Sequence, residues 1–195
     1  MRPIQSTTYS PLWSHKSDEE IWAAIKNDDK DAFTYVYNKY IHCLYDYAKK
    51  LHFDDDLISE EIQNLFIEIW QHRKNKSTIK NTKFYLLKSL RYKIFRNITK
   101  GHKSGFLSLS YNPIEVEIVS PYEKSLIEHE VDEERKFKIA SQISNLPGQQ
   151  REIINLLFYQ EYSYENISEI MGINIRSVYT LAWKAISRLR KKISE

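Results

Sequence analysis

The sequence predicts an all-α protein of two small helical domains joined by a flexible linker, with a helix-turn-helix in the C-terminal domain. Only four Gly and five Pro occur among 195 residues, too few for the many tight turns of an all-β fold. Apolar residues recur at helical spacing before residue 100 and again from residue 123, as amphipathic helices require. Between these stretches, residues 101–122 contain Gly, Ser and Pro without a sustained period, which indicates a linker.

Four helices are expected in the first half of the chain, after a flexible lead-in over residues 1–16. Ser17 and Glu20 have the spacing of a capping box, which predicts the start of the first helix. A break at residues 27–29 precedes a second helix over residues 30–51. A third helix is predicted over residues 54–72 and a fourth over residues 84–100, with a polar loop between them.

The third predicted helix has one apolar stripe and one polar face. The stripe consists of Ile58, Ile62, Leu65, Phe66, Ile69 and Trp70. Burial of this stripe leaves Glu60, Gln63, Asn64 and Glu68 outside. From the residues alone, this polar face is as well explained by simple solvation as by a partner.

Charge is segregated along the chain, although the formal net charge is only +3. From Arg73 to Lys103 there are eleven Lys or Arg and no acidic residue. Eight acidic residues and one Lys follow between Glu115 and Glu134, and six basic residues and one acidic residue lie from Arg176 to the end. A long basic block without a carboxylate favours binding of a polyanion over a merely solvated surface.

Other features exclude several classes of function. The single cysteine, Cys43, cannot form an internal disulfide, which fits a reducing, cytoplasmic location. No apolar stretch approaches the ~20 residues of a membrane span, and residues 1–16 lack the apolar core of a signal peptide. The six histidines show no metal-ligand spacing, and no phosphate loop or nucleophile motif is present. The sequence therefore predicts a protein that is not an enzyme and needs no cofactor or metal.

Residues 163–186, SYENISEIMGINIRSVYTLAWKAI, interrupt a helical pattern once, at Gly172. Ser163 is a candidate N-cap, Gly172 can adopt the positive φ that ends a helix, and Asn174 can cap a second helix. The core of the second helix is expected to contain Ile175, Val178, Ala182, Ala185 and Leu189 and part of Trp183. Two short helices with a Gly-containing turn predict a helix-turn-helix, whose second helix enters the DNA major groove. A plain αα-hairpin is the alternative.

These residues resemble a known family. The stretch LPGQQREIINLLFYQEYSYENISEIMGINIRSVYTLAWKAISRLRKKI is similar to the promoter-binding domain of extracytoplasmic-function (ECF, group 4) sigma factors of the sigma-70 family. The segment EEIQNLFIEIW and the basic, aromatic stretch KFYLLKSLRYKIFRNITK resemble successive segments of the same family, in the right order. The resemblance covers residues 17–195, and the recognition helix resembles the branch common in Bacteroidetes-type bacteria.

The resemblance implies two tasks for residues 17–100, which correspond to sigma region 2. Glu60, Gln63 and Asn64 are expected to dock on the β′ clamp helices of core RNA polymerase. Recognition and melting of the −10 element would involve Lys80, Lys83, Lys88, Arg91, Tyr92 and Arg96. Relatives often carry Asn at the position of Tyr92, which departs from the family pattern.

Residues 135–195 correspond by the same resemblance to sigma region 4, after an acidic linker at residues 101–134. Contacts with the −35 element are expected from Arg176, Ser177, Tyr179, Thr180, Trp183, Lys184 and Arg188. Many relatives carry a basic residue at the position of Tyr179. Readout is therefore expected to depend more on Arg176, DNA shape and phosphate contacts.

The implied partners are core RNA polymerase, through its β′ clamp helices and β flap, promoter DNA, and a membrane-bound anti-sigma factor. The free chain is expected to be a monomer without direct membrane insertion. A conventional helix-turn-helix regulator is the alternative: it would act as a dimer on a palindrome and would not be a polymerase subunit. A helical adaptor is a weaker alternative, because it leaves the basic block unexplained.

Overall fold

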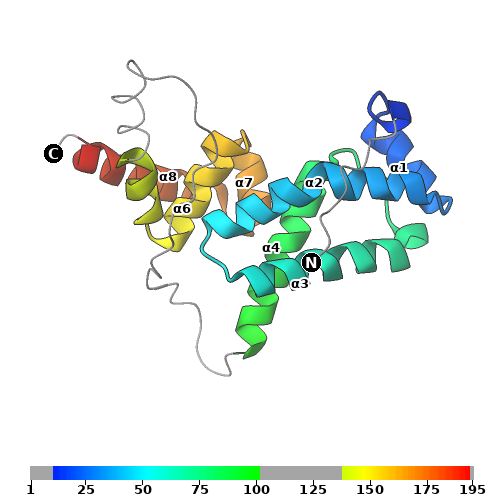
Figure 1. The fold of residues 1–195 in the computed structure, drawn as a ribbon. Coiled ribbons are helices and arrows are strands. Elements are labelled where there is room, and N and C mark those ends of the chain that lie inside the picture. Colours follow the sequence, from blue (N-terminus) through cyan, green and yellow to red (C-terminus); the bar gives the residue numbers. More distant parts are fainter. Residues whose placement is uncertain (1–10, 102–137, 194–195) are drawn as a thin grey trace, which may run out of the picture. The chain divides into compact units, whose positions relative to one another are not determined.

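The computed structural model describes residues 11–101 and 138–193 (Figure 1). Within these ranges every regular element is a helix and none is a strand, so the predicted all-α class is confirmed. The chain divides into two compact units. The N-terminal unit contains Met1–Ala48 and Asp54–His102, and the C-terminal unit contains Lys49–Phe53 and Lys103–Glu195. Nearly all of the predicted linker, residues 101–134, lies outside the described residues.

In the N-terminal unit, α2 and α3 run roughly antiparallel and α4 crosses α3 at a steep angle (Figure 1). Its elements are η1 (Pro11–Trp13), α1 (Asp18–Lys26), α2 (Lys30–Lys50), α3 (Asp55–Gln71), η2 (Arg73–Asn75) and α4 (Thr82–Gly101). A flexible lead-in was expected over residues 1–16. Residues 11–13 of this stretch instead form a 3-10 turn in which Trp13 is buried. Residues 1–10 lie outside the described residues.

Helix α1 begins at the predicted capping box. The Ser17 hydroxyl accepts a hydrogen bond from the Glu20 amide at 3.2 Å, and the Glu20 carboxylate accepts one from the Ser17 amide at 2.9 Å. The Ser17 amide, helped by Lys16, lowers the pKa of Glu20 from about 4.5 to about 2. The amides of Ser17 and Glu20 are thus each satisfied by the other residue's side chain. Because the two residues are only three apart, the sequence was sufficient to predict where this helix begins.

Trp22 links α1 to the start of α4. Its side chain is 1% exposed, and its ring nitrogen donates to the Thr82 hydroxyl at 2.8 Å. The Thr82 amide in turn donates to the Asp18 carboxylate at 2.7 Å. The Tyr85 ring meets the Trp22 ring edge-on, with centroids 5.6 Å apart. The α1–α4 contact therefore combines a large buried ring with two hydrogen bonds between elements far apart in the sequence.

Helix α8 is the central element of the C-terminal unit and packs against α6 and α7. The unit comprises a helical segment over residues 138–144, α6 (Gly148–Ile154), the π-turn η3 (Asn155–Tyr159), α7 (Tyr164–Met171) and α8 (Ile175–Ile193). One core cluster joins Leu146, Ile154 and Ala185, with Ile143, Ile186 and Leu189 packed against it.

The connection between α7 and α8 has the predicted helix-turn-helix geometry. The Ser163 hydroxyl accepts from the Asn166 amide at 3.2 Å and caps α7. Gly172 ends that helix with a φ of 65°, and the Asn174 carboxamide oxygen accepts from the Ser177 amide at 2.8 Å at the start of α8. All three local predictions for this turn are confirmed.

Replacing Gly172 with Ala should destabilise the C-terminal unit by about 1 kcal/mol. A Cβ at Gly172 would meet nothing within 4 Å, so the cost comes from the left-handed backbone, which disfavours residues with a Cβ. Gly148→Ala is the matched control, because Gly148 also has open space but no positive φ. Thermal unfolding followed by circular dichroism measures both. An equal loss in the two variants would contradict the backbone explanation.

Candidate nucleic-acid interface

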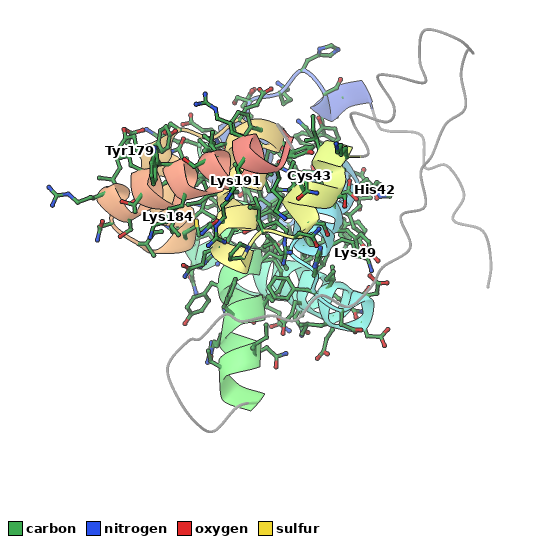
Figure 2. All side chains as sticks on the ribbon, turned by 90° about the vertical axis from the view of Figure 1, so that its left-hand side faces the viewer. His42, Cys43, Lys49, Tyr179, Lys184 and Lys191 are labelled. Carbon is green, nitrogen blue, oxygen red and sulfur yellow. The ribbon has the colours of Figure 1, made fainter. Side chains whose placement is uncertain are left out.

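The outer side of α8 presents most of the side chains predicted to contact DNA. Val178, Ala182 and Ala185 are at most 2% exposed and face the core, so the opposite side of this helix faces solvent. Arg176, Tyr179, Thr180, Trp183, Lys184 and Arg188 are exposed, and Ser177 is half-buried. Figure 2 shows Tyr179 and Lys184 on different sides of the α8 ribbon. Together these side chains form a broad face with basic, hydroxyl and aromatic groups.

Two residues expected in the core are exposed instead. Trp183 was predicted to be partly buried but is 69% exposed. Val178, Ala182 and Ala185 form the buried side of α8, and Trp183 lies outside it. Ile175, the first residue of α8, is 37% exposed. The exposed face of α8 is thus more aromatic and apolar than the sequence pattern suggested.

The basic side chains of this face are not neutralised by described neighbours. In the part of the chain that the structure describes, Arg176, Lys184 and Arg188 take part in no ion pair. The Thr180 hydroxyl, by contrast, donates to the Arg176 carbonyl at 2.9 Å and so is satisfied within its own helix. Among the described residues, no carboxylate offsets these three cations, and exposed cations of this kind suit a polyanion such as DNA.

Tyr179 stacks on Tyr164, a residue of α7 that the sequence analysis did not identify as part of a site. The ring centroids are 4.3 Å apart and the planes are 24° from parallel. Tyr179 is 50% exposed, and Tyr164 is half-buried. One face of the Tyr179 ring is therefore covered by protein, and the rest of the ring remains open to solvent.

Helix α4 forms a second basic surface in the N-terminal unit. Leu86, Leu87, Leu90 and Ile94 are fully buried on its inner side. Of the predicted residues, Lys88, Arg96 and Tyr92 are exposed, Tyr92 by 64%. Lys80, in the preceding loop, is also exposed, whereas Lys83 and Arg91 are half-buried.

Two aromatic rings of α4 support cations rather than filling the core. Phe84 and Phe95 are both half-buried. The Lys88 ammonium lies 5.6 Å from the Phe84 centroid, and the Arg91 guanidinium lies 4.4 Å from the Phe95 centroid. Such cation–π contacts orient the basic groups without neutralising them.

Arg73 anchors the start of the loop that precedes α4, a role that the sequence analysis missed. Its guanidinium pairs with Asp28 and lies 4.1 Å from the Trp70 ring centroid. Lys74 also contacts Asp28, at 3.2 Å. Hydrogen bonds from Arg73 and then Lys74 lower the pKa of Asp28. No local signal could have indicated this pairing, because the partners are 45 residues apart.

The polar face of α3 contains one unexpected apolar residue. Glu60 and Gln63 are exposed, and Asn64 is half-buried. Ile67 is 45% exposed and lies on the same face, since residues three, four and seven apart share one side of a helix. Its exposure could have been predicted from the sequence, because Ile67 lies outside the apolar stripe that α3 buries.

Two other polar residues of α3 are engaged within the protein. Glu61 is buried, and its carboxylate accepts from the Asn97 carboxamide at 2.7 Å. Glu68 pairs with Lys93, whose hydrogen bond lowers the pKa of Glu68. Neither carboxylate is a free group on the face that contains Gln63.

The described residues contain no group of three or more His, Cys, Asp or Glu side chains placed to hold a metal ion. Among residues 11–101 and 138–193, none of the helices has the length and apolarity to cross a membrane.

Comparison with known proteins identifies the C-terminal segment most directly. Residues 136–193 match the family described as sigma-70, region 4. A comparison with curated protein sequences returned no match.

Two solved structures are similar over most of the chain. CnrH, solved in complex with the cytosolic domain of CnrY, has a TM-score of 0.60 at 13% identity, over 92% of this chain and 98% of that chain. The sigma factor RpoE, in complex with the anti-sigma factor NepR from Bartonella quintana, has a TM-score of 0.57 at 19% identity, over 81% and 94% of the two chains. At these identities the likeness establishes a shared fold.

Proposed function

We propose that this chain is a sigma factor of the extracytoplasmic-function type, which binds core RNA polymerase and directs it to specific promoters. The observation that carries the proposal is the helix-turn-helix within residues 136–193, the segment that matches sigma-70 region 4. Its second helix presents exposed cations and aromatic rings on the side away from the core. That surface suits a major groove, where cations contact phosphate and other side chains read base edges.

The N-terminal unit supplies the other two surfaces that a sigma factor needs. Gln63, Asn64 and Ile67 on α3 form a mixed polar and apolar patch suited to a protein partner, because interface cores join apolar anchors with a few hydrogen bonds. Lys88, Tyr92 and Arg96 on α4 offer phosphate contacts and an exposed ring that can stack on an unpaired base. In this proposal the first patch docks on the β′ clamp helices and the second acts at the −10 element.

Further partners follow from the same proposal. The two solved structures compared above are complexes, CnrH with the cytosolic domain of CnrY and RpoE with the anti-sigma factor NepR. An anti-sigma factor anchored in the membrane would hold this chain inactive in the cytoplasm. The sequence of its recognition helix resembles the branch of this family that is common in Bacteroidetes-type bacteria, and we assign the chain to that branch on this basis. A sigma factor is not an enzyme, so the chain would contribute promoter recognition and melting but no catalytic step.

The test of the proposal is reconstitution. The purified chain should co-elute with core RNA polymerase and should start transcription at defined sites that core enzyme alone does not use. A dimeric regulator would behave differently: it would elute as a dimer, bind a palindrome without polymerase and leave core enzyme without specific starts. That second outcome would reject the sigma-factor proposal.

Replacing both Gln63 and Asn64 with Ala should weaken binding to core polymerase by roughly thirtyfold. Two lost hydrogen bonds at ~1 kcal/mol each correspond to that factor. The fold should be retained, because Gln63 is exposed and Asn64 is half-buried. Titration of labelled chain with core enzyme measures the affinity, and circular dichroism checks the fold.

Thr34→Ala is the matched control, since Thr34 is an exposed polar residue of α2 in the same unit. It should bind as the original chain does. Full binding by the folded double variant would remove α3 from the docking surface.

A further inference from the structure

We propose that the stacked pair Tyr164–Tyr179 determines base specificity by presenting an aromatic surface to the C5-methyl group of a thymine in the −35 element. The inference rests on the proposed promoter-binding function and assigns distinct roles to the two rings. Tyr179 would touch the base, and Tyr164 would be a positioning residue that holds the Tyr179 ring. Promoter recognition through α8 could hold even if this assignment failed.

The geometry gives Tyr179 a fixed orientation. Its ring lies 4.3 Å from that of Tyr164, centroid to centroid, with 24° between the planes. The two residues belong to different helices, α8 and α7, whose relative position is fixed by the capped turn at Gly172. An aromatic ring held in this way keeps few rotamers, so it loses little conformational entropy when it meets a ligand.

Tyr179 also stands at the edge of the face that DNA would meet. Arg176 lies one turn before it and Trp183 one turn after it, since residues three and four apart share a helix side. Half of the Tyr179 surface is open to solvent, and Trp183 is 69% exposed. The exposed aromatic residues are thus flanked by cations that take part in no ion pair among the described residues.

Charge complementarity selects DNA as the occupant of this aromatic surface. The last turn of α8 adds Arg190, Lys191 and Lys192, and no acidic side chain lies between Ile175 and Ile193. A helix with this charge favours a polyanion. A large aromatic ring that faces DNA is best matched by an apolar group of the DNA. In the major groove that group is the thymine methyl.

The aromatic pair would replace hydrogen-bond readout at this position. An arginine side chain reads guanine with two hydrogen bonds, whereas the Tyr179 ring, stacked on Tyr164 at one face, offers aromatic carbon and a single hydroxyl. The same helix therefore combines one cation suited to guanine, Arg176, with one ring suited to thymine, Tyr179. The −35 element is therefore expected to contain a thymine at the position that Tyr179 contacts. A helix with arginine in place of Tyr179 would favour guanine at that position.

Selection from DNA with a randomised −35 region tests the assignment, using the full chain bound to core RNA polymerase. The original chain should enrich thymine at one position, and Tyr179→Arg should replace that thymine by guanine. Tyr164→Ala should relax the preference at that position alone, because its effect acts through the neighbouring ring. Tyr164→Phe retains the stack and should retain the thymine preference.

A second measurement isolates the methyl group. Replacing the selected thymine with deoxyuridine removes only that group, and the affinity of the original chain should fall about fourfold, equivalent to ~0.8 kcal/mol. Tyr179→Arg should show no such fall. The Tyr164→Phe chain should show the full effect, and Tyr164→Ala a smaller one.

The outcomes separate this inference from the function on which it rests. Specific transcription with equal affinity for thymine and deoxyuridine DNA would overturn the tyrosine assignment and leave the sigma-factor proposal standing. Unchanged base selection by Tyr164→Ala and Tyr179→Arg would also overturn it and would point to a protein partner for the aromatic surface. Absence of any specific transcription by the original chain would instead reject the proposed function.

Discussion

Replacing Trp22 with Ala should lower the free energy of unfolding of the N-terminal unit by about 3–5 kcal/mol, the usual cost of truncating a buried aromatic residue. Trp22 is 1% exposed, contacts the Tyr85 ring edge-on and donates a hydrogen bond to Thr82. The truncation removes the buried ring and leaves a cavity. It also takes a partner from the Thr82 hydroxyl. Urea denaturation followed by circular dichroism measures the loss.

Trp183→Ala makes the same chemical change at an exposed site and is the matched control. Because Trp183 is 69% exposed, its removal should change the free energy of unfolding by no more than about 0.5 kcal/mol. Trp22→Phe retains most of the ring and loses the hydrogen bond, so it should lie between the two. Equal stability of the Trp22→Ala and Trp183→Ala chains would contradict the packing described for α1 and α4.

Replacing Arg176 with Ala should reduce the preference for an intact −35 element over a scrambled one by about 1–3 kcal/mol. The loss reflects an arginine that reads a base edge through two hydrogen bonds. The double replacement of Lys184 and Arg188 with Ala should act differently, because phosphate contacts are the same in every sequence. It should weaken binding to both DNAs alike and should lower the salt slope by roughly 0.9 for each contact removed.

The measurement is binding and transcription by the reconstituted polymerase on the two promoters at several salt concentrations. All three side chains are exposed on α8, so circular dichroism should remain unchanged. Lys30→Ala, an exposed cation of the N-terminal unit, controls for the loss of positive charge. If neither the Arg176 variant nor the double variant alters initiation that depends on the −35 element, α8 is a structural helix.

The positions of the helices and most of their ends could be predicted from the sequence, because they depend on residues only a few positions apart. The Ser17–Glu20 capping box, the Gly172 turn and the Asn174 cap all use groups within four residues of one another. The same applies to buried stripes such as Leu86, Leu87 and Leu90, whose spacing follows the helical repeat. On α3 and α4, the residues outside the buried stripe form the polar face and the basic face, respectively.

Side-chain environments within those faces were less predictable. Trp183 was expected to be partly buried, yet Val178, Ala182 and Ala185 form the buried side of α8 and the indole is exposed. Ile67 was overlooked on α3, where one exposed isoleucine accompanies the polar residues. Ile67 lies outside the apolar stripe of α3, so the helical repeat itself was the signal for its exposure, whereas the repeat along α8 did not distinguish Trp183 from its buried neighbours.

The sequence by itself determined the helical class, the capped turn between α7 and α8, and the concentration of basic residues on two segments. Only the tertiary structure decided which distant groups meet. Trp22 contacts Thr82 across 60 residues, Asp28 holds Arg73 across 45 residues, and Tyr164 of α7 stacks on Tyr179 of α8. The physical reason is one of range: caps and amphipathic repeats arise from covalent neighbours, whereas these pairs form only after packing brings separate helices together.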